Sequence, residues 1–288
     1  MATAEEKALE LIAKGDKKLT SMFASLFGNK YEDAEVLYSK AANQLKVAKS
    51  WEAAGSAFEK SAQCHLKMES PHDAATAYQN AALCYKKTNA AQAVLLYKEV
   101  VSIHIDLGRF NSAAKVQKEI GELYEAEGDL AQAMDAFQTA ADYYQAEESN
   151  STANQMLLKV AGLAAMAKEY KRAVEIYEQV AIASLDSNLL KFSVKGYLLR
   201  AGLCRLATGG VGAAVHALER YEGLDATFGQ TREGALLRDL VSAFENIDED
   251  LFTDKVREFD EISRLDPQTT TLLLEIKTRI KASAVDIT

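Results

Sequence analysis

Alanine recurs through the first two thirds of the chain at intervals of 19 or 20 residues, at Ala34, Ala54, Ala74, Ala93, Ala113, Ala133, Ala153 and Ala173. Four residues after each alanine stands a large apolar or aromatic side chain, except at Gln117. Seven and eight residues after it stand further small or apolar residues. These positions lie on one face of an α-helix. The pattern therefore predicts a row of short helices, each burying the same face.

Two successive helices make a repeat unit of about 40 residues, longer than the roughly 34 of a tetratricopeptide repeat and near the length of HEAT or armadillo units. Small residues let neighbouring helices approach closely, so a ring on one helix fills the space beside an alanine on another. We expect an all-α fold, a tetratricopeptide-like α-solenoid of lengthened helix pairs. Solenoids offer extended surfaces to other macromolecules, which favours an interaction protein.

The segments outside the repeats have their own patterns. A loose apolar stripe predicts a helix over residues 5–19, and four large apolar side chains follow within 21–28, outside the repeat register. The array extends from about 31 to 185. Beyond it the spacing is irregular, which favours a C-terminal bundle that caps the solenoid, with helices at 188–207, 213–221, 232–244, 251–265 and 267–282.

We therefore expect three regions: an N-terminal helix with an apolar loop at 1–30, the helical repeats at 31–186, and a C-terminal helical bundle at 187–288. The last residues, 283–288, lack a packing pattern and should fray. The two prolines, in Ser70-Pro71 and Asp266-Pro267, predict helix starts, each with an N-cap residue followed by proline at the first helical position.

Charge is distributed unevenly along the chain. The net charge is −9, and residues 233–266 carry eleven acidic and four basic side chains. An acidic chain is a poor candidate for non-specific nucleic-acid binding. The acidic segment is either a solvated helix face or a docking surface for a basic partner.

The residue patterns of common catalytic sites are missing from the sequence. It contains no phosphate-binding loop, no zinc-protease motif and no nucleophile elbow. Its four histidines are scattered without ligand spacing, and Cys64 and Cys84 share one repeat position, where buried apolar residues are expected. We expect neither an enzyme nor a bound cofactor or metal. With no signal sequence and no membrane-spanning apolar run, the expected location is the cytoplasm.

Several strings are specific beyond the repeat pattern. They are LFG at 26–28, AKSW at 48–51, DLGRF at 106–110, EESNS at 147–151, LKVAG at 158–162, LLK at 189–191, EFD at 258–260, RLD at 264–266 and TTLLL at 270–274. Together they resemble the α-type soluble NSF attachment proteins, in one colinear register from about residue 5 to the C-terminus. That family binds the four-helix SNARE bundle and recruits the hexameric N-ethylmaleimide-sensitive factor, an ATPase that disassembles the bundle.

The resemblance implies three sets of functional residues. The SNARE-facing basic positions are Lys86, Lys87, Arg109, Lys115, Lys159, Lys195 and Arg232. The apolar loop implies a weak peripheral membrane contact through Met22, Phe23, Leu26 and Phe27. Binding and activation of the ATPase are implied for Glu245, Asp248, Glu249, Asp250 and Ile287.

Some positions depart from the family pattern. Gln155 stands where animal members have lysine, and Ser242 and Asn246 replace acidic residues, which shifts the expected ATPase footprint toward residues 248–250. Ile287 replaces a penultimate leucine that stimulates the ATPase, so stimulation by the β-branched side chain is expected to be weaker. Two alternative functions stay open at this point, those of a γ-type trafficking paralogue and of a tetratricopeptide chaperone cofactor.

Overall fold

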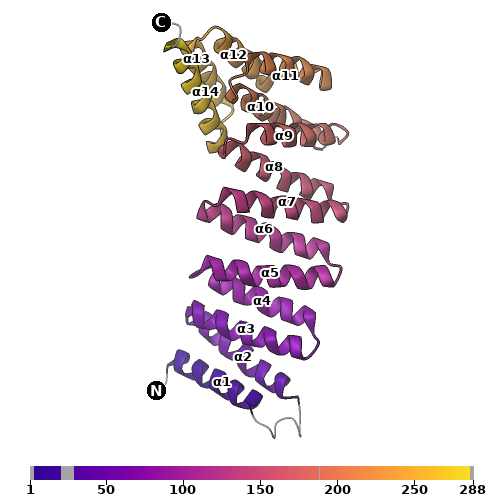
Figure 1. The fold of residues 1–288 in the computed structure, drawn as a ribbon, viewed down its shortest axis with the longest axis vertical. Coiled ribbons are helices and arrows are strands. Elements are labelled where there is room, and N and C mark those ends of the chain that lie inside the picture. Colours follow the sequence, from indigo (N-terminus) through magenta and orange to yellow (C-terminus); the bar gives the residue numbers. More distant parts are fainter. Residues whose placement is uncertain (1–2, 21–28, 188, 286–288) are drawn as a thin grey trace. The chain divides into compact units, whose positions relative to one another are not determined.

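The computed structural model describes residues 3–20, 29–187 and 189–285 (Figure 1). Within these ranges the secondary structure is helical, without strands. The first nine helices are α1 (Ala4–Thr20), α2 (Lys30–Val47), α3 (Trp51–Lys67), α4 (Pro71–Tyr85), α5 (Ala90–Asp106), α6 (Phe110–Glu127), α7 (Leu130–Ala146), α8 (Asn150–Met166) and α9 (Tyr170–Leu185). The predicted array and first helix are confirmed.

The remaining helices are α10 (Lys191–Ala207), α11 (Val211–Leu224), the 3-10 helix η1 (Phe228–Gln230), α12 (Arg232–Glu245), α13 (Glu249–Ile262) and α14 (Pro267–Val285). None of the helices in the described ranges is both long enough and apolar enough to cross a bilayer. The chain forms two compact units: unit 1 comprises residues 1–129 with 139–153, and unit 2 comprises 130–138 with 154–288. The three-region division at residues 30 and 186 stays a prediction.

The repeating alanines form the interior of the helix array, as predicted. All eight have 0% of their surface exposed. The large side chains four residues later are buried too, apart from the partly buried Gln117. Close approach of helices recurs in unit 1, where the Tyr38 ring packs against Gly15, and a Cβ atom on that glycine would lie 2.7 Å from the ring. Rings and small residues are therefore matched between neighbouring helices.

The helix connectors repeat with the same period. A residue with positive φ ends successive helices at Lys49, Glu69, Gly108, Gly128, Glu148 and Lys168. The next N–H bonds back to the carbonyl five residues before it, as from Ser50 to Leu45 at 2.9 Å, which completes a Schellman turn. Asn89 departs from the period with φ −149° and instead caps α5 by accepting from the Gln92 N–H. One turn geometry thus reverses the chain after most helices of the array.

The two proline-marked helix starts are confirmed, but their caps differ. Asp266 Oδ1 accepts a 2.9 Å hydrogen bond from the Thr269 N–H. Ser70 precedes α4 without a side-chain cap bond. Its hydroxyl faces the Met68 carbonyl instead, at 3.5 Å.

Several predicted boundaries in unit 2 need correction. α10 begins at Lys191 rather than 188, after a turn in which Leu190 N–H bonds Ser187 O at 3.0 Å. α13 begins two residues earlier than expected and ends at Ile262, because Asp260 accepts from the Leu265 N–H and closes the chain into a turn.

The ends of α11 and α14 also differ from the sequence predictions. α11 spans residues 211–224 rather than 213–221, with the buried Tyr221 in its last turn. α14 continues through Val285, so residues 283–285 are helical rather than frayed. Ile276 and Ile280 are buried and anchor this helix near its end. Helix elongation past such an anchor adds a backbone hydrogen bond for each residue.

All three cysteines are buried and unpaired, as the repeat position of two of them predicted. Burial raises the pKa of the Cys64 thiol to about 11 and that of Cys204 to about 12. A thiol with such a pKa holds its proton at neutral pH and is a poor nucleophile or metal ligand. These residues act as small apolar side chains.

Candidate functional site

Four of the predicted SNARE-facing residues belong to unit 1, and two of these meet over α6. Lys86 follows the last residue of α4 and reaches α6, where its Nζ lies 2.9 Å from Glu119 Oε2. Lys115 precedes Glu119 by one helical turn and is exposed. Lys86 and Lys115 therefore share one face of α6. Lys87, next in the turn, is exposed and makes no ion pair with any residue the structure describes.

Arg109 lies apart from Lys87. The two residues flank opposite ends of α5, a helix of 17 residues, which corresponds to about 25 Å. Arg109 Nη1 lies 2.9 Å from His72 Nδ1. Because arginine only donates, His72 accepts through this nitrogen. The predicted basic residues of unit 1 are therefore spread along the helices rather than gathered in one pocket.

The other three predicted basic residues belong to unit 2. Lys159 is exposed on α8, with its Nζ 5.7 Å from the centre of the Phe137 ring. Lys195 Nζ lies 3.2 Å from Glu233 Oε1, beside Arg232 at the start of α12. Arg232 is exposed and donates a long hydrogen bond of 3.5 Å to Ser263 Oγ. Lys195 is thus held at the start of α12, where Arg232 precedes Glu233.

Two exposed apolar side chains around the start of α10 were not predicted as site residues. Leu189 is 91% exposed and Phe192 is 78% exposed. The Lys195 ammonium lies 4.6 Å from the centre of the Phe192 ring. An exposed ring beside a lysine suits a partner surface that carries both acidic and apolar side chains. The sequence signal was the loosening of the repeat register beyond residue 186.

The predicted ATPase contacts surround the corner between α12 and α13. Glu245 and Asp250 are exposed, and within the described ranges neither forms an ion pair. Asp248 caps α13 by accepting from the Leu251 N–H at 2.8 Å. Glu249 is bound to α14, with Lys281 at 3.0 Å and Lys277 at 3.3 Å. The hydrogen bond from Lys281 is the main cause of a lowered Glu249 pKa.

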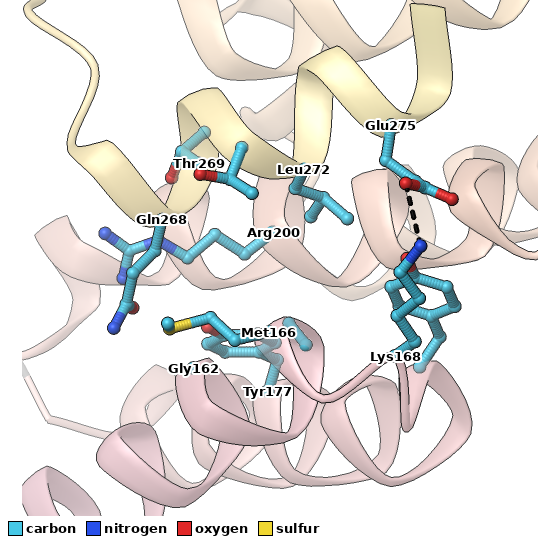
Figure 2. Close-up of a pocket in the computed structure, with 12 residues that line it drawn as sticks. Gly162, Met166, Lys168, Tyr177, Arg200, Gln268, Thr269, Leu272 and Glu275 are labelled. Atoms are coloured by element: carbon cyan, nitrogen blue, oxygen red, sulfur yellow. Dashed lines mark hydrogen bonds and ion pairs between the residues drawn. The ribbon is translucent and has the colours of Figure 1, made fainter. Parts of the chain in front are cut away.

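α14 packs on α8, α9 and α10 through the contacts shown in Figure 2. Lys168 Nζ and Glu275 Oε2 are 3.0 Å apart, and Arg200 Nη2 and Asp266 Oδ2 are 2.9 Å apart. The cavity between these helices holds only about 50 Å³, room for one or two waters. It is a helix-packing site, which fixes the helix that precedes the C-terminal residues.

The remaining predicted residues lie outside the described part of the chain. They are Met22, Phe23, Leu26 and Phe27 of the apolar loop, and Ile287 near the C-terminus. Within the described residues, no group of three or more histidine, cysteine, aspartate or glutamate side chains is arranged to hold a metal ion.

The chain is similar over its whole length to proteins of several kingdoms. It is 46% identical to the alpha-soluble NSF attachment protein of Vitis vinifera, over 99% of this chain and 98% of that one. It is 42% identical to the human alpha-soluble NSF attachment protein, with 98% of each chain covered. A probable vesicular-fusion protein sec17 homologue of Schizosaccharomyces pombe is 39% identical, over 97% of this chain and 98% of that one.

A solved structure supports the repeat fold. A signal-transduction ATPase with a tetratricopeptide-repeat sensor, from Pyrococcus horikoshii, matches 96% of this chain and 46% of its own with a TM-score of 0.52. At 15% identity that likeness concerns the fold alone. The family model described as "Soluble NSF attachment protein, SNAP" matches residues 6–281. By this match and by its full-length relatives, the chain belongs to the soluble NSF attachment protein family.

Proposed function

We propose that this chain is the adaptor that binds assembled SNARE complexes and then recruits and stimulates the hexameric ATPase N-ethylmaleimide-sensitive factor, which disassembles them. The observation that carries the proposal is the full-length similarity to α-type attachment proteins, 46% and 42% identical. These relatives and the fission-yeast vesicular-fusion homologue are named as attachment or fusion proteins and not as enzymes. Membership of the family likewise favours this role over that of a chaperone cofactor.

In this adaptor, SNARE binding is electrostatic and is shared among several basic residues. An acidic helical bundle attracts the exposed cations of both units, chiefly Lys87, Lys115, Lys159 and Arg232. An exposed ion pair contributes only about 0–1 kcal/mol, so affinity requires several pairs acting together, and long-range attraction speeds their encounter. The exposed Phe192 adds apolar contact beside Lys195.

The ATPase is recruited at a different place from the SNARE bundle. The exposed carboxylates Glu245 and Asp250, with the capping Asp248, offer negative charge to a basic partner surface. Glu249 contributes less, because two lysines of α14 already balance its charge. Ile287 supplies the apolar contact that stimulates hydrolysis.

The adaptor works in the cytoplasm as a peripheral membrane protein and binds no nucleic acid. Met22, Phe23, Leu26 and Phe27 insert shallowly into the bilayer. Full burial of such a side chain is worth about 1.5–3 kcal/mol, and partial insertion is worth less. The loop therefore becomes an effective anchor only when several adaptors occupy one membrane-bound complex.

A pull-down with pre-assembled SNARE complex tests the core of this proposal. We expect the double variant Lys115→Glu/Lys159→Glu to lose nearly all binding, each single variant to lose part of it, and wild-type binding to fall steeply with salt. The matched control reverses two exposed lysines elsewhere, Lys98→Glu/Lys171→Glu, with the same change in net charge. Equal binding by the two double variants, at low and at high salt, would contradict the proposal.

A further inference from the structure

The start of α12 is held firmly against the 3-10 helix η1. Thr231 Oγ1 accepts a 3.1 Å hydrogen bond from the Gly234 N–H and caps the helix. A Cβ atom on Gly234 would clash with the carbonyl oxygen of Phe228, so this close approach of backbone to backbone needs glycine. The Phe228 side chain is itself fully buried. The backbone before and after Glu233 is therefore fixed by capping and packing.

Glu233 reaches from this helix start to α10, with most of its side chain out of solvent. The side chain is 15% exposed, and its Oε1 lies 3.2 Å from Lys195 Nζ. Its Oε2 is buried without a hydrogen-bond partner in the described part of the chain. The neighbouring Arg232 donates to Ser263 instead, in a long bond of 3.5 Å. Among the described residues, Lys195 is therefore the cation that balances the Glu233 charge.

The ion pair fixes where the Lys195 ammonium lies. Lysine carries its charge on a flexible four-carbon stem, so an unpaired lysine samples many rotamers in water. Here the Nζ atom lies 4.6 Å from the centre of the Phe192 ring, and only 30% of the Lys195 side chain is exposed. A carboxylate in the first turn of a helix is stabilised by the helix dipole even without a cation. Glu233 is therefore the fixed partner, and Lys195 is the side chain that it orients.

We propose that Glu233 is a positioning residue for SNARE binding: it holds the Lys195 ammonium beside the exposed Phe192 ring, so that cation and ring meet the acidic bundle together. The inference deepens the proposed SNARE binding and rests on it. A side chain that is ordered before binding loses less conformational entropy when the partner arrives, which is worth about fivefold in affinity. Repulsion between Glu233 and an acidic partner is limited, because Lys195 balances the Glu233 charge.

NMR of the whole chain, labelled with carbon-13 at the lysine Cε positions, tests the positioning directly. The ring current of an aromatic side chain shifts the signal of a methylene group held beside it, and the Lys195 signal is identified by its loss in Lys195→Ala. We expect a shifted signal in the wild type and in Glu233→Gln, whose amide oxygen still accepts from the ammonium. In Glu233→Ala the signal should move to the position of exposed lysines. An unchanged Lys195 signal in Glu233→Ala would refute the inference.

Capture of pre-assembled SNARE complex tests the consequence for binding. Glu233→Ala and Glu233→Gln remove the same charge, so the difference between them measures positioning alone. We expect Glu233→Ala to bind about fivefold more weakly than Glu233→Gln, and the difference to vanish when both also carry Lys195→Ala. Glu175→Ala removes an exposed carboxylate elsewhere in unit 2 and should bind like the wild type. Equal binding by the two Glu233 variants, or a gain in both, would contradict the inference.

Failure of the proposed SNARE contact gives a different result. In that case Lys195→Ala would bind the SNARE complex as well as the wild type, and the inference would fall with the contact. If Lys195→Ala weakens binding but neither the spectra nor the capture distinguish Glu233→Ala from Glu233→Gln, the contact stands and the positioning role alone is refuted. Thermal unfolding of each variant is the folding control, and Glu233→Ser replaces Glu233→Ala if the alanine variant does not fold.

Discussion

The hydroxyl of Tyr221 donates a 2.6 Å hydrogen bond to Oε1 of Glu178 in the interior of unit 2. The carboxylate lies on α9 and the phenol on α11, and Arg205 of α10 donates to the same oxygen at 2.8 Å. Arg220 also contacts Glu178. Burial alone raises the pKa of a carboxyl group, but the hydrogen bonds from Tyr221, Arg205 and Arg220 outweigh it and leave the Glu178 pKa lowered. One carboxylate thus connects three successive helices.

Replacing this carboxylate by an amide should destabilise the protein. Glu178→Gln keeps the side-chain shape but leaves Arg205 and Arg220 without their counter-charge, and breaking a buried pair costs about 3 kcal/mol. Urea unfolding at neutral pH measures the loss. The control is Glu175→Gln, an exposed position on the same helix, which should change the free energy of unfolding by less than about 0.5 kcal/mol. A similar loss in both variants would contradict the assigned role.

The stability contributed by Glu178 should depend on pH in one direction. Its pKa is lowered in the folded state, so its contribution is complete above the unfolded pKa of about 4.3 and is lost as the pH falls through the lower folded value. The difference in unfolding free energy between wild type and Glu178→Gln should therefore be constant from pH 7 to about 5 and shrink below it. A difference that grows on acidification would be inconsistent with this linkage.

At the left-handed turn positions, removing a glycine should destabilise the protein, whereas introducing one should not. Gly128 has φ 80° and a Cβ there would meet nothing within 4 Å, so Gly128→Ala tests the backbone alone and should cost about 1 kcal/mol. Glu148 occupies the matching turn position with φ 56°, so Glu148→Gly should be neutral or stabilising by less than about 1 kcal/mol. Thermal unfolding distinguishes them. A neutral Gly128→Ala would show that the turn does not need a left-handed residue.

The apolar loop should matter only when a membrane is present. Phe23→Ser/Phe27→Ser removes two rings that gain free energy only on leaving water. Disassembly of liposome-borne SNARE complexes should slow several-fold, and disassembly in detergent should proceed at the wild-type rate. Disassembly assays in the two formats, with equal SNARE and ATPase concentrations, make the comparison. Equal slowing in both would indicate a role in folding.

Charge reversal at the α12–α13 corner should weaken ATPase recruitment. Glu245→Lys/Asp250→Lys alters two exposed carboxylates without breaking an ion pair in the described structure, so co-sedimentation of the ATPase should fall about tenfold while SNARE binding is retained. Glu249→Lys should also lower the melting temperature, because it repels Lys277 and Lys281 of α14. Unchanged recruitment by the double variant would place the ATPase contact elsewhere.

The penultimate residue, Ile287, should be needed for stimulation of the ATPase but not for its recruitment. Ile287→Ala should keep SNARE binding and ATPase recruitment but lose most of the stimulated turnover, measured as steady-state phosphate release with immobilised adaptor. Ile287→Leu serves as the matched control and should stimulate at least as well as the wild type, because the unbranched Cβ removes a steric restriction. Full stimulation by Ile287→Ala would show that activation arises in another part of the chain.

The repeat array could be predicted from the sequence because its signal is local. Alanine and a ring four residues later lie on one helical face whatever surrounds them, and every one of the eight alanines is fully buried. Glycine marks two of the turns between repeats, at Gly108 and Gly128, because it adopts a positive φ without steric cost. Lys49 and Glu148 adopt the same conformation without that signal. There the packing of the flanking helices sets the backbone.

The arrangement of the charged residues required the tertiary structure. Lys86 and Glu119 are 33 positions apart in sequence, and Tyr221 and Glu178 are 43 apart, so no local pattern joins them. From residue type alone, Glu249 and Asp250 look alike. In the structure, two lysines of α14 pair with Glu249, whereas Asp250 forms no ion pair within the described residues. Helix periodicity is a local signal: it specifies which face of each helix is buried. Which charges meet on the remaining faces depends on how the helices pack, and that packing is settled by the shapes of all the buried side chains together.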